Sequence, residues 1–226
     1  AIGAIAFAFS SYFFIIIEAG HMTKAHAIAY VPLVVASVLY TYRGKVLVGG
    51  IFTALAVALQ LYANHLQITY YLLLVLILIG FVQLFKDIKG NNLIDFFKRS
   101  FVLLLAALLG SCTSYTVLAT TMEYGEDSTR GKSELTTNLE NKTSGLDKDY
   151  ATSWSYGIAE TFTLLIPNFY GGASQGSLSE DSKTFQAIKR APNAKKIIKN
   201  LPLYWGDQPF TSGPTYAGAV VVFLFV

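Results

Sequence analysis

The sequence is divided into long apolar runs without charge, separated by short clusters of charged residues. Residues 1–17 carry no charged side chain, and neither do residues 27–41. Between them, residues 18–26 place a carboxylate, two imidazoles and an ammonium in nine positions. A bilayer core of about 30 Å requires about 20 mostly apolar helical residues, so runs of this kind are typical of membrane spans. The alternation predicts a chain that crosses a bilayer several times, with its charged clusters at the surfaces.

Composition supports this interpretation. Of the 226 residues, 53% are hydrophobic and only 14% are charged, and the mean hydropathy is +0.47. Soluble domains carry about 25% charged residues. The net charge of +3 is small and no basic stripe is interleaved with aromatic residues, so we expect no nucleic-acid partner. The expected class is an all-α polytopic membrane protein that is embedded in a lipid bilayer.

The apolar runs define the expected transmembrane bundle, residues 1–119. Its five spans cover about residues 1–17, 27–42, 46–63, 66–85 and 101–119. Residues 214–226 are expected to begin a further span. Because both ends of the sequence fall in apolar runs, we expect it to be an internal part of a longer chain.

Residues 120–213 are polar, with acidic and basic residues in nearly equal number, and are expected to form an ordered loop domain. Within them, residues 154–166 are expected to form a helix that lies on the bilayer, ending before Pro167. Its apolar side chains recur at helical spacing: Ile158, Phe162, Leu165 and Ile166.

The basic residues of the short connections predict the topology. Six of them fall on one side of the expected spans: Arg43, Lys45, Lys86, Lys89, Lys98 and Arg99. By the positive-inside rule this side is cytoplasmic. The opposite side then carries Glu18, Lys24, His65 and residues 120–213, which are predicted to be extracytoplasmic.

The charged cluster at residues 18–26 is the first candidate binding site. Lys24, with His21 or His26, could receive a phosphate near the membrane surface, because an ammonium is a good phosphate binder and an imidazolium adds directed donors. The structural alternative is that Lys24 reaches to lipid headgroups and the histidines lie at an ordinary interface. Glu18 could be a base, a cation ligand or the partner of Lys24.

Metal and disulfide chemistry are not expected. His21 and His26 are five residues apart, whereas two ligands on one helical face are four apart. Cys112 is the single cysteine, which excludes an intrachain disulfide and any cysteine-cluster metal site.

Four strings resemble the bacterial YfhO family of membrane proteins, in particular its large Bacteroidetes versions. They are GHMTKAHAIAYVPL at 20–33, STRGKSEL at 128–135, GLDKDYATSWSYGIAETFTLLIPNFYGG at 145–172 and YWGDQPFTSGPTYAGA at 204–219. The family is similar to the GT-C glycosyltransferases, which take a sugar from a polyprenyl-phosphate carrier on the outer face of the membrane. The resemblance implies a GT-C-like helix bundle with a mixed extracytoplasmic loop domain in the bacterial inner membrane.

The resemblance also implies roles for residues. In that class the usual catalytic carboxylate lies in the first outer loop, and we expect this chain to begin after it, so no catalytic residue is assigned. The candidates for the donor phosphate are Lys24, His21, His26 and Arg130. The candidates for the sugar or for an envelope glycan or lipid acceptor are Glu18, Asp147, Trp154, Glu160 and Trp205. Each of these residues could instead have a purely structural role. A divalent cation is compatible with the chemistry, but the residues do not require one.

Two other classes of function fit the same sequence. A non-catalytic subunit or scaffold of an envelope assembly would use residues 120–213 to dock partners. A proton-coupled transporter would use Glu18, Lys24 and His65, but the spans are almost free of ionisable residues at mid-depth, where a transport pathway needs them.

Overall fold

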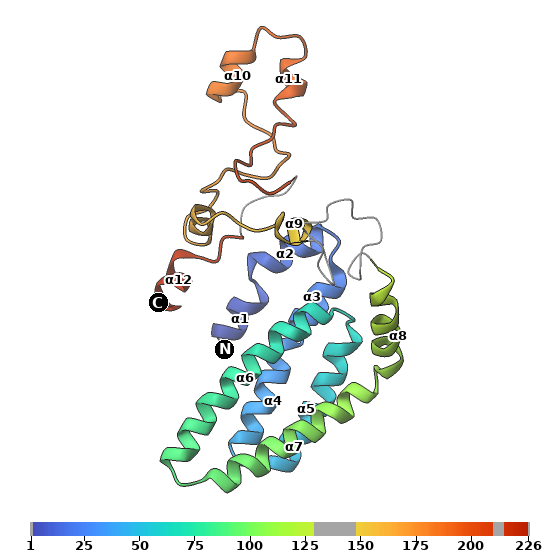
Figure 1. Ribbon diagram of the computed structural model, residues 1–226. Helices are drawn as coiled ribbons and strands as arrows, with labels where there is room; N and C mark the ends of the chain where they lie inside the picture. The colour runs from blue at the N-terminus through green and yellow to red at the C-terminus, as the bar shows by residue number, and fades with distance from the viewer. Residues whose placement is uncertain (1, 129–147, 210–214, 226) are drawn as a thin grey trace. The chain divides into compact units, whose positions relative to one another are not determined.

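The computed structural model describes residues 2–128, 148–209 and 215–225, and it divides the chain into two compact units (Figure 1). The first unit comprises residues 1–9 and 13–125; the second comprises residues 126–226 together with 10–12. Every regular element in the described residues is a helix, with two isolated β-bridges, Gly171 to Tyr204 and Gly176 to Leu201. The expectation of an all-α chain is confirmed for these residues.

Helices α1 to α8 belong chiefly to the first unit. Their bounds are α1 Ile2–Ala8, α2 Ser11–Glu18, α3 Met22–Ala29, α4 Val31–Tyr42, α5 Val46–Tyr62, α6 Leu66–Lys89, α7 Leu93–Cys112 and α8 Tyr115–Glu126. The second unit holds α9 Lys148–Thr152, the 3₁₀ helix η2 Ala159–Leu164, α10 Lys183–Ile188, α11 Ala194–Ile197 and α12 Ala219–Phe225.

Within the part of the chain that the structure describes, two helical stretches are long and apolar enough to cross a membrane. They are Met22–Tyr42, which joins α3 and α4 over 21 residues, and α6, with 24 residues. The pair of α7 and α8 adds a third if a helix bent by 77° is counted as one span. The expected spans 1–17 and 46–63 appear as shorter apolar helices. These lengths and compositions support membrane association.

The surface of α6 supports it further. Large apolar side chains stand exposed around this helix: Leu73, Val75, Leu78, Val82 and Phe85. A soluble helix hides such residues on one face, whereas a helix that is apolar all round suits hydrocarbon.

Small residues bring α5 close to its two main neighbours, α4 and α7. A Cβ added to Gly49 would overlap Thr41, and one added to Gly110 would lie 2.5 Å from the Ala54 carbonyl oxygen. Buried hydroxyl groups also lie between α4 and α5, where Thr53 Oγ1 is 3.1 Å from Ser37 Oγ. Small residues that allow close backbone approach are the usual basis of helix association in lipid.

The two ends of this helix bundle differ in chemistry. At one end Tyr42 stacks on Phe96 and hydrogen-bonds Ser100 at 3.0 Å, which brings the turn at Arg43 beside the first turns of α7. At the other end Ala27 of α3 packs against Ala63 and Ile68, at the turn between α5 and α6. The six basic connection residues therefore gather at the first end, and the charged cluster of α2 and α3 lies at the second.

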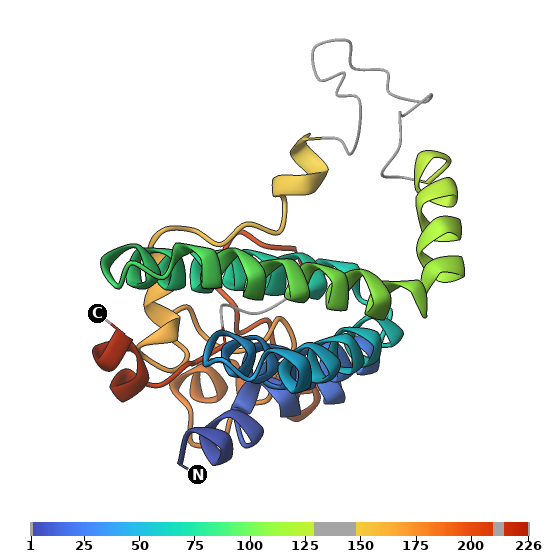
Figure 2. The ribbon, with the colours of Figure 1, turned by 90° about the horizontal axis from the view of Figure 1, so that it is seen from below.

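Two expected spans are interrupted in the structure. The apolar run 1–17 forms two helices, which separate at Phe9 and Ser10. The run 101–119 is divided between α7 and α8, and Figure 2 shows α8 leaving the direction of α7 sharply. At this bend Ser111 and Thr113 donate their hydroxyls to the Ala107 and Gly110 carbonyls. Such bonds compete with the helical ladder and bend helices.

The second unit is organised by a ribbon of antiparallel contacts. Backbone bonds join Trp205 to Tyr170 (2.9 Å), Gly172 to Leu203 (3.1 Å) and Leu178 to Ile198 (3.0 Å). The helices α10 and α11 close the far end of this ribbon.

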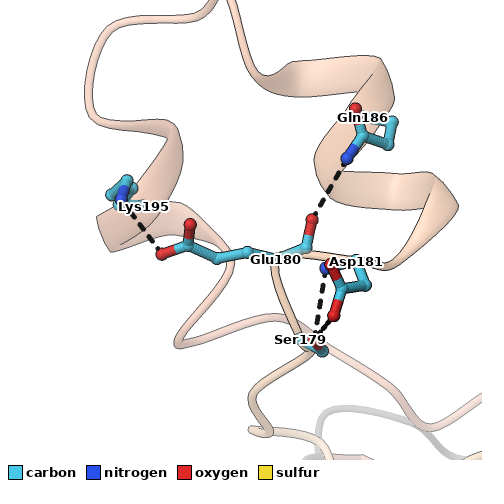
Figure 3. A network of polar contacts seen from close by, with 5 residues as sticks. All are labelled: Ser179, Glu180, Asp181, Gln186 and Lys195. Atoms are coloured by element: carbon cyan, nitrogen blue, oxygen red, sulfur yellow. Dashed lines mark hydrogen bonds and ion pairs between the residues drawn. The ribbon is translucent and has the colours of Figure 1, made fainter.

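Polar contacts fix this helical tip (Figure 3). Lys195 on α11 pairs with Glu180 at 3.2 Å, and Gln186 on α10 donates to the Glu180 carbonyl oxygen at 3.3 Å. Ser182 caps α10 by accepting a bond from the Phe185 N–H. Residues 173–200 thus contain the helices α10 and α11.

Candidate functional site

The first candidate site is the turn between α2 and α3. Glu18 ends α2, and Gly20, at φ +80°, allows a reversal in which the His21 N–H bonds the Ile16 carbonyl oxygen at 2.8 Å. His21 then precedes the first residue of α3 and makes no capping bond with its side chain. This turn and the following helix α3 therefore carry three of the predicted phosphate ligands: His21, Lys24 and His26. Both imidazoles are exposed, and Lys24 is half-buried.

An apolar pocket lies further along the same helical stretch. It has a volume of about 330 Å³ and is lined by Leu33, Ala36, Ser37, Tyr40 and Phe52. Tyr30, which joins α3 to α4, keeps helical dihedral angles, and Pro32 falls at the start of α4, where its missing N–H costs least.

His26 shares a face with this pocket. His26, Leu33 and Tyr40 are spaced seven residues apart, which places them on nearly the same side of a helix. Seven residues rise about 10 Å, so an imidazole stands roughly that far above the pocket's edge, at the polar end of the bundle. The arrangement combines a hydrogen-bonding, titratable group with an apolar recess, as an amphiphilic ligand would require.

The second candidate site, in the second unit, is the junction of the strings at 145–172 and 204–219. The Glu160 carboxylate is 1% exposed and accepts two hydrogen bonds. One comes from the Gly157 N–H (2.6 Å) and the other from the Tyr204 hydroxyl (2.5 Å). Residues 145–172 and 204–219, which both carry the resemblance, are thereby joined at one buried carboxylate.

Gln208 and Gly206 complete this junction. The Gln208 side-chain amide donates to the Trp154 carbonyl oxygen at 2.8 Å, and its backbone N–H donates to the Tyr204 hydroxyl oxygen at 3.3 Å. Gly206 approaches so closely that a Cβ there would overlap both Glu160 Oε1 and the Tyr204 hydroxyl. Burial, and then the bond to Glu160, raise the pKa of Tyr204 to about 12.

The two tryptophans flank the junction and face solvent. Trp205 is 80% exposed and Trp154 is 41% exposed. Trp205 lies against Gly171, where a Cβ would be 2.5 Å from its ring. The Trp205 indole is thus largely exposed, whereas both oxygen atoms of Glu160 are engaged by the protein.

The structure places the other predicted residues unequally. Arg130 and Asp147 lie outside the described residues. Among the described residues, no group of three His, Cys, Asp or Glu side chains could hold a metal ion. Sequence reasoning missed Tyr204, Gly206 and Gln208, whose only signal was their membership of the string at 204–219.

Comparison of the chain with protein-family models, with curated proteins and with solved structures finds no match to any of them. The function is therefore inferred from the residues and the geometry of the two sites.

Proposed function

We propose that this chain acts in the bacterial inner membrane as a protein of the glycosyltransferase kind, which transfers a sugar from a polyprenyl-phosphate donor to an envelope glycan or lipid. The observation that carries the proposal is the alignment of His26 with the apolar pocket at Leu33 and Tyr40 on one helix face. A polyprenyl phosphate has the matching order of parts, a charged head followed by a hydrocarbon chain.

The residues at the polar end suit the phosphate head. An imidazolium donates directed hydrogen bonds, and a lysine adds a point charge. His26 and Lys24 belong to one helix, and His21 stands at its start, so the head would meet three potential donors within six residues. The first part of the isoprenoid chain would occupy the pocket between α4 and α5.

These groups would act on the leaving group. Inverting transfer of a sugar needs a carboxylate that activates the acceptor and cations that stabilise the departing lipid phosphate. His21, Lys24 and His26 are proposed for the second role. Glu18, which is exposed at the end of α2, is the carboxylate nearest to them in sequence and is proposed to contact the acceptor.

In the second unit, the indoles are proposed separately as sugar-binding groups. The broad apolar face of Trp205 or Trp154 suits the C–H face of a sugar ring, and each keeps a polar N–H at its edge. Glu160 would act indirectly, because it positions Trp154 and Trp205 by holding their two strings together.

Binding of a labelled polyprenyl phosphate to the purified full chain tests the proposal. His26→Ala should weaken binding about tenfold or more, since a hydrogen bond to a charged group contributes about 1.5–3 kcal/mol. Leu33→Trp should weaken it by filling the pocket. His65→Gln is the matched control, because it changes a histidine that lies off this face, on the turn before α6. Unchanged affinity in His26→Ala, Lys24→Ala and Leu33→Trp would contradict the assignment.

A specific observation favours a second candidate, a scaffold subunit of an envelope assembly. The carboxylate at the centre of the second unit is wholly engaged in joining two segments, which is what a docking domain of fixed shape requires. A scaffold would retain envelope glycosylation in His26→Ala and Leu33→Trp cells but lose assembly when the junction is disrupted by Gly206→Leu. A transferase would instead lose envelope glycosylation in His26→Ala and Leu33→Trp cells.

A further inference from the structure

The 3₁₀ helix η2 has its polarity inverted. Its charged residue Glu160 and its Thr163 are buried, at 1% and 6% exposed. Its apolar neighbours face outward instead, with Ile158 at 93% and Phe162 at 51% exposed. In water this is the unfavourable order, because exposed apolar area is costly and a buried carboxylate requires dedicated donors.

The exposed residues form one connected surface. The Ile166 N–H bonds the Phe162 carbonyl oxygen at 2.8 Å, and the rings of Phe162 and Phe169 are 5.5 Å apart. We call the set Ile158, Phe162, Ile166 and Phe169 the apolar ridge. Between Asp149 and Glu180 the only charged residue is Glu160, which is buried, so no exposed charge lies on this stretch of chain.

The ridge is tied to the segment that leads into α12. The Ala217 N–H donates to the Leu164 carbonyl oxygen at 3.1 Å, two residues before α12 begins. That short helix is apolar and exposes Val220, Val221 and Phe223. The segment that carries the ridge is thus hydrogen-bonded, through Leu164, to the chain that leads into a second exposed apolar surface in the same unit.

We propose that the apolar ridge docks onto the lipid bilayer, with Phe162 and Phe169 among the headgroups and upper acyl chains. Three observations favour a bilayer over another occupant. Among the described residues, two helical stretches are long and apolar enough to span a bilayer, so a bilayer is a surface that this chain is expected to meet. The ridge has no charge to guide a protein partner, and its segment is hydrogen-bonded to the chain that leads into apolar α12. Aromatic side chains at a membrane surface are the usual anchors of such interfacial segments.

The inference does not require the glycosyltransferase proposal. Its consequence is that the second unit would itself contact the membrane surface, through the apolar ridge.

Tryptophan fluorescence tests the proposal, because the sequence has only two tryptophans. Replacing Trp154 and Trp205 by Phe gives a background in which Phe162→Trp is the single reporter. The full chain is reconstituted into vesicles of phosphatidylcholine with brominated acyl chains. The emission from position 162 should be shifted to the blue relative to water and should be mostly quenched by the bromine, with little quenching by aqueous iodide.

Ile197→Trp in the same background is the matched control. Ile197 is 43% exposed, close to the 51% of Phe162, but belongs to α11 at the tip of the ribbon. Its emission should be quenched by iodide and not by brominated lipid. Equal iodide quenching at both positions, without quenching by lipid at 162, would overturn the proposal. Protection of position 162 from both quenchers would overturn it as well, because that result indicates a protein surface, such as a second copy of the chain, as the occupant.

Discussion

Glu160 is held by donors from both sides along the sequence, and this explains how a carboxylate can be buried in a loop segment. Gly157 lies three residues before it and Tyr204 lies 44 residues after it. The first bond closes a local turn, whereas the second fixes the return of the chain. A buried acid without such donors would be strongly destabilising.

Removing the Tyr204 hydroxyl should destabilise the second unit. In Tyr204→Phe, one oxygen of buried Glu160 loses its donor, which costs about 1–3 kcal/mol. Trp205→Phe is the control, because that side chain is 80% exposed and its replacement should change stability little. The stability is measured by denaturant titration, with unfolding of the second unit detected as limited proteolysis within residues 148–209. Equal protease resistance in both variants would contradict the role given to this bond.

The same residue predicts a loss of stability in alkali. The pKa of Tyr204 rises from 10.0 to about 12 on folding, so the folded state favours the neutral phenol. Its contribution is therefore fully present below pH 10 and is lost as the pH rises through about 12. The stability difference between the parent and Tyr204→Phe should shrink across this window, as measured by denaturant titration at each pH. A difference that stays constant there would show that Tyr204 does not titrate with the predicted shift.

Among the features of this chain, the positions of the helices are the ones that the sequence predicts best. Charge clusters and apolar length predict the turns at Arg43 and Asn64, whereas α6 continues to Lys89, past the end at residue 85 that its apolar run predicts. The break between α7 and α8 does not follow from them, because it depends on whether Ser111 and Thr113 bond back to carbonyls within one helical turn. Likewise the helix expected over 154–166 is present only as η2, since Glu160 and Thr163 are buried at the three-residue spacing of a 3₁₀ helix.

Close helix packing predicts a contrast among the glycines of the apolar helices. Gly110→Ala should destabilise the bundle by about 1–3 kcal/mol, because its Cβ would press on the Ala54 carbonyl of α5. Gly80→Ala is the matched control, since its Cβ would meet only the Tyr42 hydroxyl, at 4.0 Å. This control should be neutral or stabilising, because alanine is the better helix former. The stabilities of the two variants are compared by unfolding them in mixed micelles with an increasing fraction of dodecyl sulfate. Equal unfolding midpoints would exclude tight packing of α5 on α7.

At the scale of the whole molecule, the chain divides into a first unit that holds most of helices α1 to α8 and a second unit that begins at residue 126 and includes residues 10–12, whereas the sequence places a boundary near residue 120. The contents of the second unit do not follow from it. Local periodicity carries no information on contacts across 44 residues, so Glu160 could be singled out but its partner Tyr204 could not. The pocket beside Leu33 was equally invisible, because it depends on how α4 and α5 pack.

Sidedness is the claim on which the functional account depends, because a lipid-borne donor and an envelope acceptor meet only outside the cell. The sole cysteine, Cys112, can be replaced by Ser, and single cysteines then introduced at exposed Ala187 on α10 and at Asn92 before α7. A maleimide that does not cross membranes is added to intact spheroplasts. The account predicts labelling of Ala187→Cys at once and of Asn92→Cys only after lysis. Labelling of Asn92→Cys in intact spheroplasts, with Ala187→Cys protected until lysis, would contradict it.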